Sequence, residues 1–187
     1  PAKSLLDQMP ALEKLELRML VSLGDLVKHS EAEDFDLLDQ LLLQPAIYPV
    51  FNAAGNHDVE NRTLYEERYG ATYYSFRDAS SWMIFLDTER ENCAIDAPQR
   101  EMLAGALDAA LRDDEVRQIF IFMHKTLFFK NERLFELKKE IAGPNVWDCY
   151  GVGNFAEILS GLIEPAARQK PVYLFAGDVG AYGNLSP

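Results

Sequence analysis

The alternation of short apolar runs with amphipathic stretches along the chain predicts an α/β fold. Apolar runs that end in glycine, asparagine or aspartate are typical of buried strands, whereas apolar residues at helical spacing indicate helices. The pattern predicts strands at residues 18–23, 47–52, 72–76, 82–87, 117–123 and 171–176. It predicts helices at residues 5–15, 33–43, 61–69, 98–111, 132–141 and 155–163.

Local signals define some of these elements more closely. Asn61 is a plausible N-cap for the helix that follows it, and Pro98 occupies a first-turn position where its missing N–H costs nothing. The strands at 72–76 and 82–87 are close in sequence, so we expect them to pair as antiparallel neighbours. Because the sequence contains no repeat, low-complexity segment or linker, we expect residues 1–187 to form a single domain.

Composition and charge exclude several classes of function. The 187 residues are 48% apolar, enough for a sizeable core, and carry a net charge of −12. We expect no nucleic-acid partner, because binding to phosphates needs a basic surface. No apolar run reaches the roughly 18–20 residues of a membrane-spanning helix. Cys93 and Cys149 are far apart, which excludes a zinc site built from cysteines but leaves one disulfide open.

Polar side chains follow four of the predicted strands, at their carboxyl ends. These side chains are Asp25, the Asn56-His57-Asp58 segment, His124 and Asp178. In open α/β sheets ligands bind beyond the carboxyl ends of the strands. Carboxylate, amide and imidazole groups suit Mn, Fe or Zn better than soft metals. The sequence therefore predicts a metal site at this edge.

The motifs at these strand ends resemble those of the calcineurin-like metallophosphoesterases. The resemblance is carried by Gly24-Asp25, Gly55-Asn56-His57-Asp58 and the lone His124 after a strand. The intervening sequence is similar to the purple-acid-phosphatase-like branch of that family. That similarity lies in Tyr69-Gly70, Tyr73-Tyr74-Ser75-Phe76, Leu86-Asp87-Thr88 and Gln99.

The resemblance implies a two-sheet α-β-β-α sandwich with one or two Mn, Fe or Zn ions at the sheet edge. It implies that Asp25 bridges or binds metal, that Asn56 and His124 bind metal, and that His57 assists the leaving oxygen. Asp58 would orient the His57 ring. The implied reaction is hydrolysis of a phosphate monoester or diester by metal-activated water. The implied partner is a phosphorylated small molecule or ester.

The chain departs from the family pattern in two places. The Asp-x-His motif expected on the first strand is absent, which predicts a domain that is incomplete at its N-terminus, and the abrupt ending raises the same expectation for the other end. The expected Gly-His-x-His is replaced by Gly177-Asp178-Val179-Gly180, so Asp178 becomes the fourth candidate metal ligand, beside Asp25, Asn56 and His124. Gly180 can offer only its backbone. The alternative is therefore a phosphoesterase-fold protein that has lost its chemistry and acts as a binding or assembly module.

Some nearby residues have simpler interpretations. The Gly-Asp-x-Gly sequence around Asp178 also makes an ordinary turn. His29 is expected to be a solvated side chain and Lys125 a surface lysine, although Lys125 stands beside His124 and could meet an anionic substrate. The sequence determines neither the oligomeric state nor the compartment.

Overall fold

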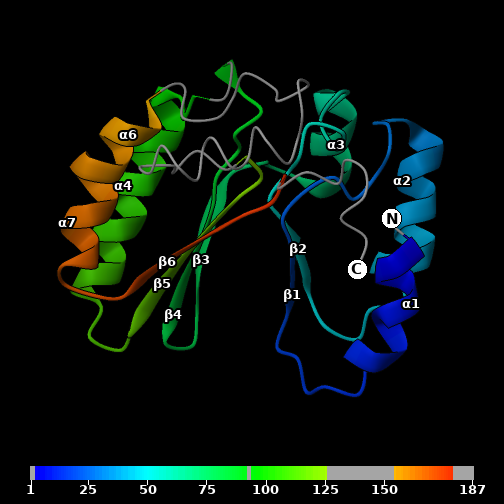
Figure 1. Ribbon diagram of the computed structural model, residues 1–187, viewed down its shortest axis with the longest axis horizontal. Coiled ribbons are helices and arrows are strands. Elements are labelled where there is room, and N and C mark those ends of the chain that lie inside the picture. The colour runs from blue at the N-terminus through cyan, green and yellow to red at the C-terminus, as the bar shows by residue number, and fades with distance from the viewer. Residues whose placement is uncertain (1–2, 92–93, 126–153, 179–187) are drawn as a thin grey trace, which may run out of the picture.

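Two sheets lie face to face between layers of helices (Figure 1). The computed structural model describes residues 3–91, 94–125 and 154–178. The smaller sheet pairs β1 (Leu20–Ser22) with β2 (Val50–Asn52) in parallel. The larger sheet has the order β3-β4-β5-β6. Its strands are β3 (Tyr74–Asp78), β4 (Ser81–Phe85), β5 (Gln118–Met123) and β6 (Val172–Ala176).

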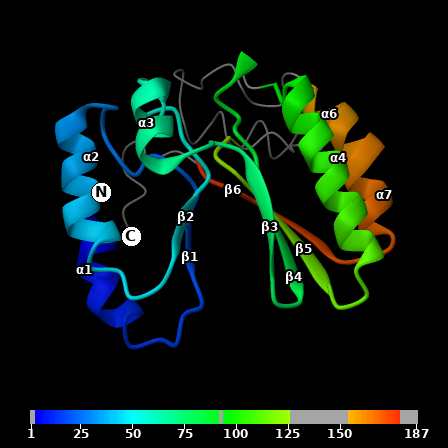
Figure 2. The same ribbon diagram turned by 180° about the vertical axis from the view of Figure 1, so that it is seen from behind.

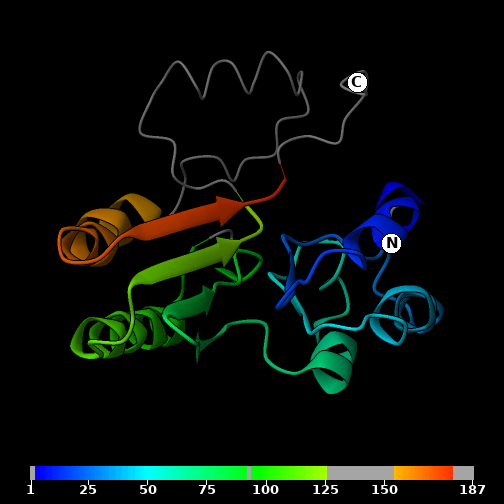
Figure 3. The same cartoon turned by 90° about the horizontal axis from the view of Figure 1, so that it is seen from below.

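The register of the larger sheet brings the ends of distant strands to one edge. β3 and β4 form an antiparallel hairpin, whereas β4, β5 and β6 run parallel to one another. Figure 3 shows β5 and β6 side by side with their arrowheads in the same direction. The residues that follow β4, β5 and β6 therefore lie close together.

Helices cover the outer face of each sheet. The smaller sheet is covered by α1 (Lys3–Leu12), α2 (Ala32–Leu38), its π-helical continuation η1 (Asp39–Leu43) and α3 (Arg62–Tyr69). The larger sheet is covered by α4 (Ala97–Arg112), α6 (Phe155–Ile158), η4 (Leu159–Ile163) and α7 (Glu164–Ala167). Both views along the short axis show the two helical groups on opposite sides (Figures 1 and 2). Among the described residues, no helix has the length and apolarity needed to cross a membrane.

An aromatic layer joins the two sheets. Phe85 of β4 is fully buried, and its ring centroid lies 5.9 Å from that of Phe51 in the smaller sheet. The Phe85 ring also stacks on Tyr74 at 4.6 Å and on Phe122 at 4.9 Å. Because such rings each bury a large apolar area, this layer fixes the sheets against one another. The predicted two-sheet α-β-β-α sandwich is confirmed.

Most predicted elements are confirmed, with shifted ends. The predicted strand at 47–52 begins only at Val50, because Pro49 has no N–H to donate to a sheet. The predicted helix at 155–163 continues to Ala167 through a π-helical segment, and Pro165 again lacks the amide that regular α-helical bonding would use. Asn61 caps α3 as predicted, accepting a hydrogen bond from the Leu64 amide at 3.3 Å. The predicted helix at 132–141 and both cysteines lie outside the described residues.

Replacement of Phe85 by alanine tests the aromatic layer. We expect Phe85→Ala to lower the free energy of unfolding by about 3–5 kcal/mol, because it leaves a cavity between the sheets. Phe175→Ala is the matched control, since its side chain is 42% exposed, and it should cost less than half as much. Equilibrium denaturation measures both losses. Equal losses would show that the interface between the sheets is not the main packing contact of Phe85.

Candidate metal site

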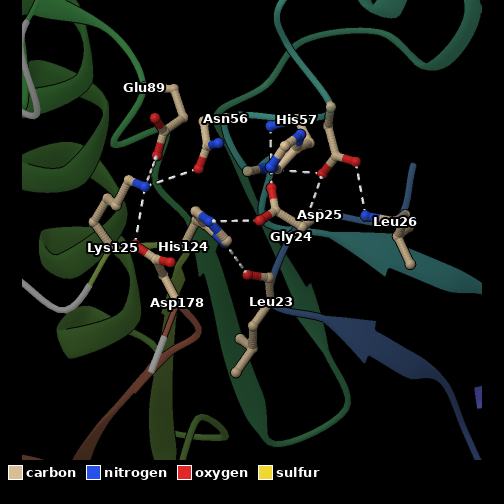
Figure 4. Close-up of polar contacts among 12 residues, drawn as sticks. Leu23, Gly24, Asp25, Leu26, Asn56, His57, Glu89, His124, Lys125 and Asp178 are labelled. Atoms are coloured by element: carbon tan, nitrogen blue, oxygen red, sulfur yellow. Dashed lines mark hydrogen bonds and ion pairs between the residues drawn. The ribbon is translucent and has the colours of Figure 1, made fainter. Parts of the chain in front are cut away.

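The loops after β1, β2, β5 and β6 meet at one edge of the molecule (Figure 4). β1 leads to Asp25, β2 to Asn56 and His57, β5 to His124, and β6 to Asp178. Asp25 and Asp178 have positive φ angles of 58° and 50°, which non-glycine residues rarely adopt. Such conformations persist only where the surrounding structure holds them in place, and they are concentrated at functional sites.

Two glycines allow the loops to approach the His124 ring. A Cβ on Gly24, whose φ is +99°, would lie 2.4 Å from His124 Nδ1. A Cβ on Gly55 would lie 2.3 Å from Asp25 Oδ1 and 2.6 Å from the Asp25 amide nitrogen. All three distances are far below van der Waals contact. The Gly-Asp and Gly-Asn-His-Asp motifs therefore need glycine for packing at the site.

Asp58 joins the first two loops. Its carboxylate is 1% exposed and accepts hydrogen bonds at 2.8–3.2 Å from five nitrogens. The donors are the amides of Asp25, Leu26, Val27 and Gly55 and the Asn52 side chain. Hydrogen bonds to an ionised carboxylate are among the stronger ones in proteins. Asp58 therefore fixes the backbone of Asp25 relative to β2.

His57 takes its orientation from a backbone group and not from Asp58. Its Nδ1 lies 2.7 Å from the Lys28 carbonyl, so Nδ1 is the donor. Its own amide donates to Asp25 Oδ1 at 3.1 Å, and its side chain is 35% exposed. The expectation that Asp58 orients the ring is thus corrected: the oxygens of Asp58 are directed to the backbone amides and to Asn52.

Asp25 and His124 form a facing pair. His124 Nδ1 donates to the Leu23 carbonyl at 2.6 Å, which leaves the lone pair of the neutral ring on Nε2. Nε2 is buried, has no hydrogen-bond partner among the described residues, and lies 3.4 Å from Asp25 Oδ2. Figure 4 shows the two side chains directed toward each other.

The charges of this pair shift both pKa values. Burial raises the pKa of Asp25, but the nearby His124 ring and the His57 amide together outweigh it and hold that pKa below its ordinary value. Burial likewise lowers the pKa of His124, but Asp25 outweighs it and raises that pKa above its ordinary value. Each group therefore favours the charged form of the other.

Lys125 is buried between the other two candidate ligands. The residue is 5% exposed, so the expectation of a surface lysine is wrong. Its Nζ donates to Asn56 Oδ1 at 2.8 Å and to Asp178 Oδ2 at 2.9 Å. Glu89 Oε1 lies 3.9 Å from the same nitrogen. Burial raises the pKa of Glu89 more than the nearby positive charge of Lys125 lowers it.

Glu89 and Lys125 were not among the predicted site residues. Both follow strands of the larger sheet at the same edge as the predicted residues, which is the signal that could have found them. The Lys125 amide donates to Thr88 Oγ1 at 3.0 Å, which ties the loop after β5 to the loop after β4. Just before Thr88, Asp87 is held by Gln99, whose side chain bonds both backbone groups of Asp87 at 2.8 and 3.0 Å.

The four predicted metal ligands thus divide into two pairs. Asp25 and His124 offer a carboxylate oxygen and an imidazole nitrogen that has no hydrogen-bond partner among the described residues, and a hydrogen bond from Nδ1 to a backbone carbonyl is typical of metal-binding histidines. Ligands of one tetrahedral ion, at about 2.0–2.2 Å each, lie roughly 3.3–3.6 Å apart, so this pair fits an ion. Asn56 and Asp178 already contact an ammonium. Within residues 3–91, 94–125 and 154–178, no group of three or more His, Cys, Asp or Glu side chains is placed to hold a metal.

The contacts of Asp58 generate a stability prediction. We expect Asp58→Asn to lower the free energy of unfolding by about 3 kcal/mol, because the substituted amide has one oxygen and no charge for five donors. Asp114→Asn, at an exposed position, is the control and should leave stability unchanged. Chemical denaturation followed by circular dichroism gives both values. If the two variants are equally stable, the carboxylate does not fix these loops.

Comparison with known proteins agrees with this arrangement of strands and motifs. The family model described as calcineurin-like phosphoesterase matches residues 3–140. No curated protein matches the chain. Because the model covers most of the sequence, including Asp25, Asn56, His57 and His124, the chain belongs to the calcineurin-like phosphoesterase family.

Proposed function

We propose that the protein hydrolyses a phosphate monoester or diester at the edge formed by Asp25, His57 and His124. The observation that supports this most is the buried His124 Nε2, which has no hydrogen-bond partner among the described residues and lies 3.4 Å from Asp25 Oδ2. A buried nitrogen lone pair costs free energy unless a proton or a cation satisfies it. A catalytic metal ion would satisfy both groups.

The proposed ion is Mn, Fe or Zn, held by Asp25 and His124. Such an ion supplies Lewis acidity, which activates water and offsets the charge of the phosphate. A positive centre would also offset the net charge of −12 of the chain, which by itself disfavours an anionic substrate. The same charge argues for a phosphorylated small molecule or ester over nucleic acid.

His57 is the proposed proton donor for the leaving oxygen. Because its Nδ1 donates to the Lys28 carbonyl, Nε2 is the ring nitrogen that would carry the transferred proton, in the imidazolium form of the ring. The hydrogen bond from the His57 amide to Asp25 Oδ1 fixes the position of the His57 backbone relative to the Asp25 carboxylate. Asp58 acts indirectly, as a positioning residue that holds the backbone of Asp25.

The alternative function is a non-catalytic binding or assembly module. The observation that favours it is the contact of Lys125 with Asn56 and Asp178, two of the predicted metal ligands. The sequence adds that Gly180 stands where the family has an imidazole. A module of this kind would keep the fold and bind a partner without hydrolysing it.

Hydrolysis of an aryl phosphate and a bis-aryl phosphate in the presence of Mn²⁺ separates the two functions. We expect turnover that a chelator abolishes, and a loss of about 100-fold or more in kcat for His57→Ala, in the range that general acids contribute. The two substrates together distinguish a monoesterase from a diesterase.

His29→Ala is the matched control for this experiment. His29 is also exposed and, like His57, lies near Glu60, with 3.7 and 3.6 Å between the ring nitrogens and its carboxylate. It has no contact with Asp25 or His124 in the described structure, so its replacement should leave kcat unchanged. Absence of hydrolysis by the wild-type protein at every metal tested would favour the non-catalytic module.

A further inference from the structure

Lys125 is a buried cation with oxygen partners from three loops. Its side chain is 7% exposed, and charged side chains are almost never this buried unless they are paired. Its ammonium contacts Asn56 after β2, Asp178 after β6 and, at a longer distance, Glu89 after β4. Lys125 itself follows β5, so one positive charge joins four strand ends (Figure 4).

The partners of this ammonium are those of a hard metal ion. Two carboxylates and one amide oxygen are the ligand types that Mn²⁺ and Mg²⁺ prefer. Asn56 is a residue that the family resemblance assigns to metal binding, and Asp178 stands where the family motif has a histidine. The ammonium and a metal ion would therefore compete for the same oxygens.

We propose that the Lys125 ammonium takes the place of one metal ion in this protein. Asn56 and Asp178 are then unavailable as metal ligands, and of the four predicted ligands only Asp25 and His124, both in the described part of the chain, remain to bind metal. To displace the ammonium, an ion would have to break the ion pair with Asp178 and the hydrogen bond to Asn56 in a site shielded from water, where such contacts are strongest.

This inference rests on the metal site proposed above, but its tests measure the number of bound ions and the labelling rate of lysine amines. They do not use hydrolysis. A protein that hydrolyses nothing could still bind one ion beside a fixed Lys125, and an active enzyme could bind two. Failure of this inference is therefore distinguishable from failure of the proposed function.

The number of ions bound by wild-type protein and by Lys125→Met tests the proposal. Methionine keeps most of the length of the side chain but has no charge. The ammonium then no longer competes with an ion for the oxygens of Asn56, Asp178 and Glu89. After dialysis against Mn²⁺, elemental mass spectrometry should find one more ion per chain in Lys125→Met than in the wild type. Lys14→Met, at an exposed position remote in sequence, should match the wild type. Equal numbers in wild type and Lys125→Met would overturn the proposal.

A second measurement uses the wild-type protein alone, in case Lys125→Met does not fold. Acetic anhydride labels exposed amines, and mass spectrometry reads the rate at each lysine. We expect Lys125 to react at least tenfold more slowly than the exposed Lys14, with or without Mn²⁺. If Mn²⁺ raises the Lys125 rate to that of Lys14, the ion displaces the ammonium and the proposal is wrong.

Discussion

The buried carboxylate of Asp58 sets the geometry on which the site depends. It accepts hydrogen bonds from three successive amides after β1 and from Gly55 and Asn52, so two loops far apart in sequence share one anion. This bonding holds Asp25 in a left-handed conformation with a φ of 58°. The glycines at 24 and 55 supply the space, since any Cβ there would collide with His124 or Asp25. Asp58 thereby acts on the site through the backbone.

The edge built in this way contains two places for positive charge. On one side, Asp25 and His124 face each other across 3.4 Å with a buried nitrogen that lacks a hydrogen-bond partner in the described structure. On the other side, the Lys125 ammonium already contacts Asn56 and Asp178. The family of calcineurin-like phosphoesterases accounts for the arrangement of strands and loops. Lys125 is a feature of this chain that the motifs alone do not reveal.

The sequence predicted most of the fold because the elements are encoded locally. Apolar runs and caps such as Asn61 depend on near neighbours, and they identified the described strands and helices to within a few residues. The meeting of Asp25, Asn56, His124 and Asp178 at one edge was also predictable, since each follows the carboxyl end of a strand.

The partners of these residues were not predictable from sequence. Whether Lys125 faces water or Asp178 depends on the pairing of β5 with β6, which no local pattern encodes. Three of the five donors to Asp58 likewise come from a loop more than thirty positions away. Strand order, and with it the charge partner of each buried group, emerges only when the sheet is assembled.

Anomalous diffraction from crystals soaked in Mn²⁺ shows whether the ion binds at Asp25 and His124 and leaves Lys125 in contact with Asn56 and Asp178. We expect a single peak between Asp25 Oδ2 and His124 Nε2, with Lys125 Nζ still bonded to Asn56 and Asp178. A peak bonded to Asn56 and Asp178, with the Lys125 side chain turned away, would contradict it.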